Sequence, residues 1–168
     1  GNEKVLKARF SDAKFFVESD KKVPSLERNE KLKNVSYLKG LGNVFNRVER
    51  IQVIAEKVIR CLDDKTIDSK KIFDAAKYCK SDLTSEIVYE FPELQGIMGG
   101  KYLRNEGFDD EICLAVSEHY LPSFYKDELP STKNGAIISI SDKIETLISI
   151  FILGKRPSGS SDPYALRR

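Results

Sequence analysis

The sequence predicts an all-α fold. Apolar residues recur every three or four positions through most of the chain, which is the period of one face of a helix. Asp, Ser, Gly and Pro stand at the ends of these segments, where helices start and stop. The chain has 168 residues, of which 40% are hydrophobic and 32% charged, so it can bury a core as one domain or as a domain with an appendage.

The clearest predicted helix covers Val44 to Leu62, with one apolar stripe through Val48, Ile51, Ala55 and Val58. We expect a second stripe from Ile72 to Phe91, capped by Asp68 or Ser69 and interrupted by Pro92.

A further helix is expected over residues 93–105, with Gly107 in a left-handed position after its end. Asp109 then caps a helix that carries Ile112, Ala115, Val116 and His119 and ends before Pro122. The polar residues 123–132 are expected to form a loop.

The stretch from Ala136 to Leu153 mixes Ile with Ser and could be a strand by propensity. Its length favours a buried helix instead, and so does the spacing of five apolar residues: Ile140, Ile144, Leu147, Ile148 and Phe151. Residues 154–163 should form a loop, and Ser161 or Asp162 before Pro163 predicts another helix. Because the sequence stops soon after this start, we expect its end not to be a natural terminus.

Near the N-terminus, one helix should carry Phe10, Phe15, Phe16 and Val17, and a second should run from Leu26 to Val35. We therefore expect three parts: an N-terminal helical segment (1–40), a helical core (41–154), and a loop with the start of a helix (155–168).

Composition limits the function. Lys and Arg total 28 and Asp and Glu 26, so the net charge of +2 does not indicate a nucleic-acid-binding protein, and any contact with a polyanion must come from local patches. No apolar run is long enough to span a membrane, and no signal peptide is recognisable. Cys61, Cys79 and Cys113 are too far apart for a zinc site, and we interpret them as buried residues of a cytoplasmic protein.

A helical domain with scattered Asp residues is similar to the HD-type metal phosphohydrolases, whose histidines and aspartates bind divalent ions. This chain has one histidine, His119. Arg47 stands where the first HD ligand would fall, and Asp82, His119 and Asp142 are at most remnants of the site. We therefore expect an HD-like bundle with a degenerate metal site and no bound metal, in which Asp82 and Asp142 cap or pair locally.

Two other features have structural interpretations. His119 stands at a helix C-terminus, where the helix dipole would favour an imidazolium, so we expect a capping or packing role. Gly99 and Gly100 precede Lys101 without the spacing of a phosphate-binding loop, so we expect tight helix packing there.

Several longer strings occur in a fixed order: EFPELQGIMGGKY (90–102), EHYLPSFYKDELPST (118–132), SDKIETLISIF (141–151) and DPYALRR (162–168). KLKNVSYLKGLGNVFNRVERI (31–51) and SDAKFF (11–16) precede them. Together they resemble the β subunit of the two-subunit bacterial glycyl-tRNA synthetase, over nearly the whole chain. The string YLKG (37–40) departs from the family pattern, which affects only the local surface.

The resemblance implies a part of a glycine–tRNA ligase that is not itself catalytic. In that family the α subunit carries the site that uses ATP and Mg, and the β subunit contributes mainly tRNA binding. The implied partners are tRNA(Gly), the α subunit in an α2β2 complex and the rest of the β subunit, with no membrane. We expect no cofactor in this chain and no catalytic residue.

Contact with tRNA requires cations near phosphates. Arg47, Arg50 and Lys57 lie away from the stripe of the 44–62 helix, so we expect them to face solvent or a partner. The full candidate set is Arg47, Arg50, Lys57, Lys77, Lys80, Lys155, Arg156, Arg167 and Arg168. Two alternatives remain: an architectural bundle that holds neighbouring β-subunit domains, and a metal phosphohydrolase, which the lack of histidines disfavours.

Overall fold

The computed structural model describes residues 2–155, 158–164 and 166, and the chain is all-α in this part. The α-helices are α1 (Asn2–Asp20), α2 (Ser25–Lys31), α3 (Val44–Leu62), α4 (Ser69–Tyr78), α5 (Glu86–Glu90), α6 (Ile97–Asn105), α7 (Asp110–Glu118) and α8 (Lys133–Ile152). Short 3-10 helices cover Leu32–Asn34, Ser81–Thr84 and Pro92–Leu94. No helix in the described part is long and apolar enough to cross a membrane.

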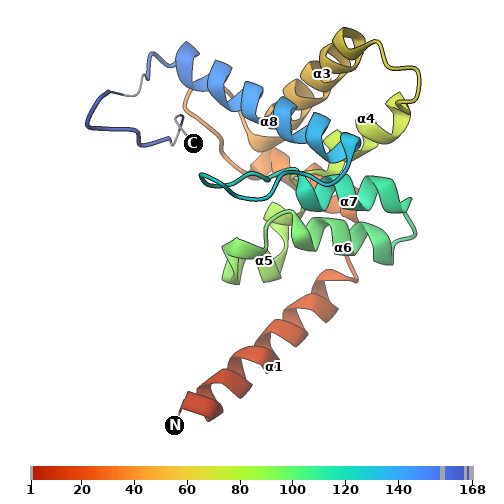
Figure 1. Ribbon diagram of the computed structural model, residues 1–168. Coiled ribbons are helices and arrows are strands. Elements are labelled where there is room, and N and C mark those ends of the chain that lie inside the picture. The colour runs from red at the N-terminus through yellow and green to blue at the C-terminus, as the bar shows by residue number, and fades with distance from the viewer. Residues whose placement is uncertain (1, 156–157, 165, 167–168) are drawn as a thin grey trace.

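The main core lies where α3, α4, α6, α7 and α8 meet (Figure 1). Its fully buried residues include Ile51, Ile72, Leu103, Val116 and Ile138. The predicted apolar stripe of α3 packs into this core. The helix has the predicted bounds, and its start is fixed by a reciprocal capping box between Asn43 and Asn46.

Helix α1 projects away from this bundle and packs on α5 (Figure 1). A second, smaller apolar cluster joins them, built from Ile87, Val88, Met98 and Tyr102 with Phe16 packed against it. The outer side of α1 stays open, with Phe10 68% and Phe15 69% exposed. The expected N-terminal helix is therefore confirmed, although two of its three aromatic residues face outward.

The predicted stripe from Ile72 to Phe91 is not one helix. It is divided into α4, a 3-10 turn and α5, because Ser81 and Ser85 turn their hydroxyls onto the carbonyls of Tyr78 and Asp82. The expected helix over 93–105 likewise begins later, at Ile97. Gly107 has the predicted left-handed conformation, with φ of 88°.

Helix α8 is confirmed, but the side that faces the core is not the one that we expected. Of the predicted stripe, Ile140, Leu147, Ile148 and Phe151 are 37–52% exposed. The buried side carries Ile137, Ile138, Ser139, Ser141, Asp142, Glu145, Ser149 and Ile150. The spacing therefore predicted the helix correctly and its buried face incorrectly.

Smaller predictions can also be checked. Cys79 and Cys113 are buried, whereas Cys61 is exposed. A Cβ added to Gly100 would lie 2.5 Å from the Cys113 carbonyl oxygen, which confirms tight packing of α6 against α7. After α8, residues 163, 164 and 166 have turn conformation, and the rest of the predicted last helix (165, 167 and 168) lies outside the described residues.

Candidate functional site

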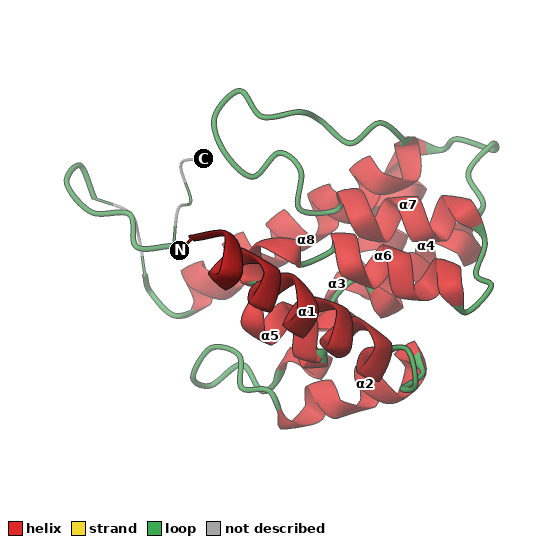
Figure 2. Ribbon diagram, turned by 90° about the horizontal axis from the view of Figure 1, so that it is seen from below, coloured by secondary structure: helices red, strands yellow, loops and turns green. Residues whose placement is uncertain are grey.

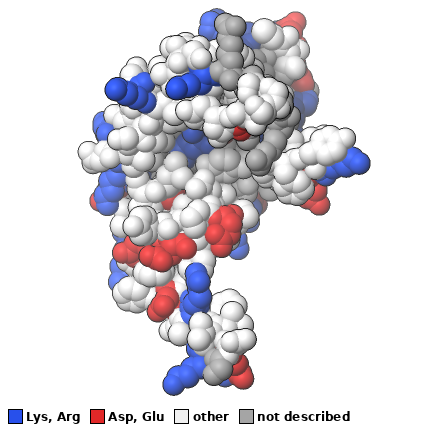
Figure 3. All heavy atoms as spheres, turned by 90° about the vertical axis from the view of Figure 1, so that its left-hand side faces the viewer, with Lys and Arg blue, Asp and Glu red and all other residues white. Residues whose placement is uncertain are grey.

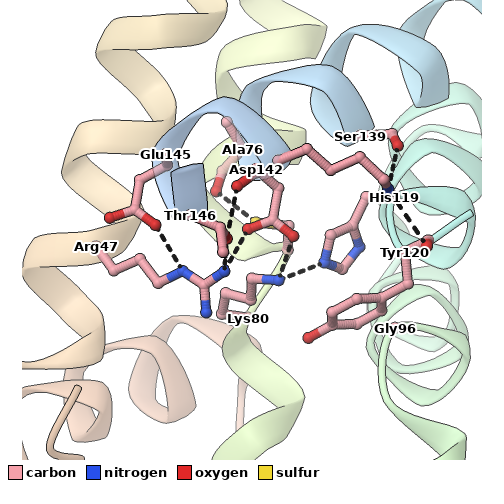
Figure 4. A network of polar contacts seen from close by, with 12 residues as sticks. Arg47, Ala76, Lys80, Gly96, His119, Tyr120, Ser139, Asp142, Glu145 and Thr146 are labelled. Atoms are coloured by element: carbon pink, nitrogen blue, oxygen red, sulfur yellow. Dashed lines mark hydrogen bonds and ion pairs between the residues drawn. The ribbon is translucent and has the colours of Figure 1, made fainter. Parts of the chain in front are cut away.

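The most unusual feature of the core is a buried ammonium group. Lys80 follows the end of α4, and its side chain is only 1% exposed. Its Nζ lies 2.8 Å from Asp142 Oδ2, 3.0 Å from His119 Nε2 and 4.0 Å from the centre of the Tyr120 ring (Figure 4). A carboxylate, an imidazole and an aromatic face thus surround one cation. These three groups replace the water molecules that the ammonium loses on burial.

His119 is neutral in this arrangement. Its Nδ1 lies 2.6 Å from the carbonyl oxygen of Val116, so Nδ1–H donates there and Nε2 is left to accept a hydrogen bond from Lys80. Burial and the nearby ammonium lower the pKa of His119 to about 3. The expected packing role is confirmed, but the imidazolium that the helix dipole would favour does not form because the side chain is fully buried.

Arg47 extends the same network toward α3. Its Nη2 lies 2.8 Å from Asp142 Oδ1, and its Nε lies 3.0 Å from Glu145 Oε2. Arg50 adds a bond of 3.0 Å from Nε to Glu145 Oε1. Burial alone would raise the pKa of Asp142, but Lys80 and Arg47 outweigh it and hold that pKa well below its usual range.

Arg47 was expected to face solvent or a partner, and it instead faces α8 of its own chain. It lies off the apolar stripe of α3, as predicted, but that side of α3 meets the acidic side of α8, and the Arg47 side chain is only 17% exposed. Lys80 likewise has no exposed donor to offer to a phosphate. Arg50 lies between these cases, because it is bonded to Glu145 yet has 36% of its side chain exposed.

The other predicted cations have different surroundings. Lys57 and Lys155 are exposed, and Lys77 is half-buried with its Nζ 5.3 Å from the centre of the Tyr78 ring. Arg156, Arg167 and Arg168 lie outside the described residues. On the face drawn in Figure 3, basic side chains are dispersed and acidic ones gather in a band, so this face shows no continuous basic surface.

Asp82 has a separate role. Its Oδ2 accepts hydrogen bonds from the backbone N–H groups of Gly96 (2.7 Å) and Gly99 (2.9 Å), so it caps α6 from a distance in sequence. Its buried Oδ1 has no hydrogen-bond partner in the described part of the chain. Burial raises the pKa of Asp82 to about 6. Asp82 thus caps a helix and Asp142 forms ion pairs, but the prediction that these contacts are local is wrong, because every partner comes from a different element.

Among residues 2–155, 158–164 and 166, no three His, Cys, Asp or Glu side chains come together as a group that could hold a metal ion. Of the three remnants, His119 and Asp142 meet at Lys80, while Asp82 faces α6. Sequence reasoning missed Glu145 and Tyr120 altogether. One signal was available for Glu145, because it stands three residues after Asp142 and therefore on the same side of an Ile-rich helix. Two carboxylates on a buried side require cations to pair with them.

The chain is similar to known proteins along its whole length. A family model described as glycyl-tRNA synthetase beta subunit matches residues 1–168. Relatives named glycine–tRNA ligase beta subunit include those of Geotalea daltonii (49% identical), Geobacter metallireducens (48%) and Thermodesulfovibrio yellowstonii (47%). Each comparison covers 100% of this chain and 24% of the relative, so the chain spans about a quarter of the length of these relatives.

Proposed function

We propose that this chain, which belongs to the family of glycyl-tRNA synthetase β subunits, is a non-catalytic domain that helps to position tRNA(Gly) for ATP-dependent attachment of glycine. The observation that carries the proposal is the family match over all 168 residues. The partners that follow are tRNA(Gly), the α subunit in an α2β2 complex and the rest of the β subunit, in the cytoplasm.

The described residues of this chain do not fit an ATP–Mg²⁺ site. Its described part gathers no set of carboxylates for the metal. Its most concentrated cations, Arg47, Arg50 and Lys80, are already bonded to Asp142 and Glu145. We therefore assign ATP and Mg²⁺ to the remainder of the enzyme and derive no chemical step from this domain.

Positioning of tRNA instead requires exposed cations on a rigid support. Lys57 on α3 and Lys155 beyond α8 are exposed and have no ion pair in the described structure, and Lys77 on α4 is partly accessible. The buried network joins α3, α4 and α8, so it fixes the helices from which these side chains project. Such contacts would neutralise phosphates and take no part in activating glycine.

The test is to replace Lys57 and Lys155 with Ala in the assembled ligase. We expect a higher KM for tRNA, and a weaker dependence of tRNA binding on salt because fewer counterions are released on binding. Formation of glycyl-adenylate should stay unchanged. Lys101→Ala, which removes an exposed lysine of α6 outside the candidate set, is the matched control. Unchanged KM and salt dependence in the double variant would reject these contacts.

An architectural role is the second candidate, and the exposed apolar side of α8 favours it. Ile148 is 50% exposed, Phe151 52% and Ile152 66%, and Val53 of α3 lies beside them with 53%. Neighbouring β-subunit domains could cover this surface. In that case Phe151→Asp should impair assembly of the ligase, whereas the lysine variants above should have no effect on tRNA binding.

We also infer that the bundle is HD-like, with a lost metal site. The support is that Arg47, Lys80, His119 and Asp142 converge from the loops and helices around one point in the core. Superposition of α3, α4, α7 and α8 on the metal-binding helices of an HD phosphohydrolase tests this. Arg47 and Asp142 should fall on ligand positions, and helices that cannot be superposed would reject the relationship.

A further inference from the structure

The segment of residues 120–132 between α7 and α8, here called the aromatic loop, extends far from the helices (Figure 2, and teal in Figure 1). It carries three large apolar side chains into solvent: Phe124 is 59% exposed, Tyr125 82% and Leu129 72%. Neither the ion-pair network nor the proposed phosphate contacts use these residues. Adjacent exposed aromatic rings are a common feature of surfaces that bind a partner.

Both ends of the aromatic loop are fixed to the bundle. At its start, the carbonyl oxygen of Leu121 accepts hydrogen bonds from Ser139 Oγ (2.5 Å) and Lys143 Nζ (3.3 Å), both on α8. At its end, the hydroxyls of Ser131 and Thr132 both donate to the Glu118 carboxylate of α7. The loop is therefore held at its ends by two different helices.

The tip of the loop is also preformed. Asp127 Oδ2 accepts from Ser123 N (2.8 Å) and Ser123 Oγ (2.9 Å), and its Oδ1 accepts from Glu128 N (2.8 Å). The Asp127 N–H closes the turn by donating to the Phe124 carbonyl (3.2 Å). Both carboxylate oxygens of Asp127 are therefore used within the turn, and Phe124, Tyr125 and Lys126 remain at its apex.

This tip combines flat rings with a cation. Lys126 is left-handed, with φ of 65°, and its Nζ lies 5.5 Å from the centre of the Tyr125 ring. Proteins bind unpaired nucleotides by stacking each base on an aromatic side chain and by placing a cation near the backbone phosphate. Rings held on a preformed turn lose little conformational freedom on binding, which favours this use.

We propose that Phe124 and Tyr125 form a stacking platform for an unpaired nucleotide of the bound RNA, with Lys126 beside its phosphate. This inference rests on the proposed function, because that function supplies the RNA. The rings would give affinity without sequence preference, since every base has a face that can stack. A protein partner at the same loop is the competing outcome of the test below.

The experiment uses the assembled ligase with Phe124→Ala and Tyr125→Ala combined. We expect the KM for tRNA(Gly) to rise about ten-fold or more, since stacking on an aromatic ring typically changes affinity by that factor or a larger one. Glycine-dependent pyrophosphate exchange should stay unchanged. The salt dependence of tRNA binding should also stay unchanged in this variant, whereas Lys126→Ala, which removes a cation of the loop, should weaken it.

Two control variants sharpen the result. Tyr89→Ala removes an aromatic ring on α5 that is also 82% exposed, and it should leave the KM unaffected. Tyr125→Phe keeps the ring while removing the hydroxyl, so it should retain most of the affinity for tRNA. A loss of affinity in Tyr125→Phe equal to that in the double Ala variant would contradict stacking.

The outcomes separate the two proposals. A wild-type ligase that fails to charge tRNA(Gly) would overturn the proposed function and the platform together. A wild type that charges tRNA, with an unchanged KM in the double variant, would overturn the platform alone. A double variant that loses pyrophosphate exchange or dissociates from the α subunit would show that the loop contacts protein, which also overturns the platform.

Discussion

The Asp142→Asn substitution tests whether the buried network determines stability. In the native chain, Asp142 is the only carboxylate in the described structure that forms an ion pair with Lys80, at 2.8 Å, and it also binds Arg47 at 2.8 Å. Asparagine keeps one acceptor oxygen but carries no charge, so the buried ammonium loses the carboxylate that neutralises it. Breaking a buried pair in this way costs about 3–5 kcal/mol, or roughly 6–20 °C in Tm for a domain of this size.

Lys80→Met is the informative partner variant. It removes the ammonium and leaves Asp142 still bonded to Arg47, so we expect a smaller loss, about 1–3 kcal/mol. The double variant Lys80→Met with Asp142→Asn should lose less than the sum of the two single changes, because neither buried charge then remains without its partner.

The assay is urea unfolding of the 168-residue chain at pH 7, followed by circular dichroism. Lys133→Met is the control, since its ion pair with Asp64 lies at the surface, where solvent screens it, and should contribute much less than the buried pair. A loss below 1 kcal/mol for Asp142→Asn, or strict additivity in the double variant, would refute the coupling that the geometry indicates.

Two further predictions concern α8 and Asp82. Ile150 is 1% and Phe151 52% exposed, so Ile150→Ala should lower the free energy of unfolding by about 2–5 kcal/mol and Phe151→Ala by about 0.5 kcal/mol or less. Urea titrations that gave the reversed order would show that the other side of α8 is buried. The native pKa of Asp82, about 6, lies above the unfolded value near 3.9, so the native carboxyl keeps a proton that the unfolded chain releases. The free energy of unfolding should therefore fall by about 2 kcal/mol as pH rises from 4 to 6, and Asp82→Asn should show a flatter profile. Parallel profiles would contradict this assignment.

Sequence patterns predicted those features that depend on neighbouring residues. The bounds of α3 follow from an apolar stripe and a local cap, and Gly107 follows from the need for a left-handed residue after α6. The division between α4 and α5 was not predictable in the same way. There the apolar spacing continues across Ser81 and Ser85, and only the hydroxyl bonds to the backbone reveal that the helix ends.

The candidate site was harder to predict because its parts come from distant segments. Arg47, Lys80 and Asp142 stand in three separate elements, and each looks like an ordinary surface charge in its own window of sequence. Periodicity locates a charge on one side of a helix, but it does not show whether that side meets solvent or an opposite charge. The resemblance to a known family identified the protein without placing these side chains.

Helix α8 shows why its apolar side could be left outside the core. Its inner side carries Asp142 and Glu145, which can be buried only if cations neutralise them. Three cations do so: Arg47 and Arg50 from α3, and Lys80 after α4. Charge pairing, together with burial of Ile138 and Ile150, therefore decides which side of α8 faces the core. If α8 instead turned its exposed stripe inward, both carboxylates would lose these partners, and the three cations would lose theirs. Burying the exposed half of the four stripe residues would gain roughly 3–6 kcal/mol in total, at about 1.5–3 kcal/mol for each whole side chain, whereas each broken buried ion pair costs about 3–5 kcal/mol. The exposed stripe is thus a consequence of the network, and it leaves an apolar surface available to a neighbouring domain.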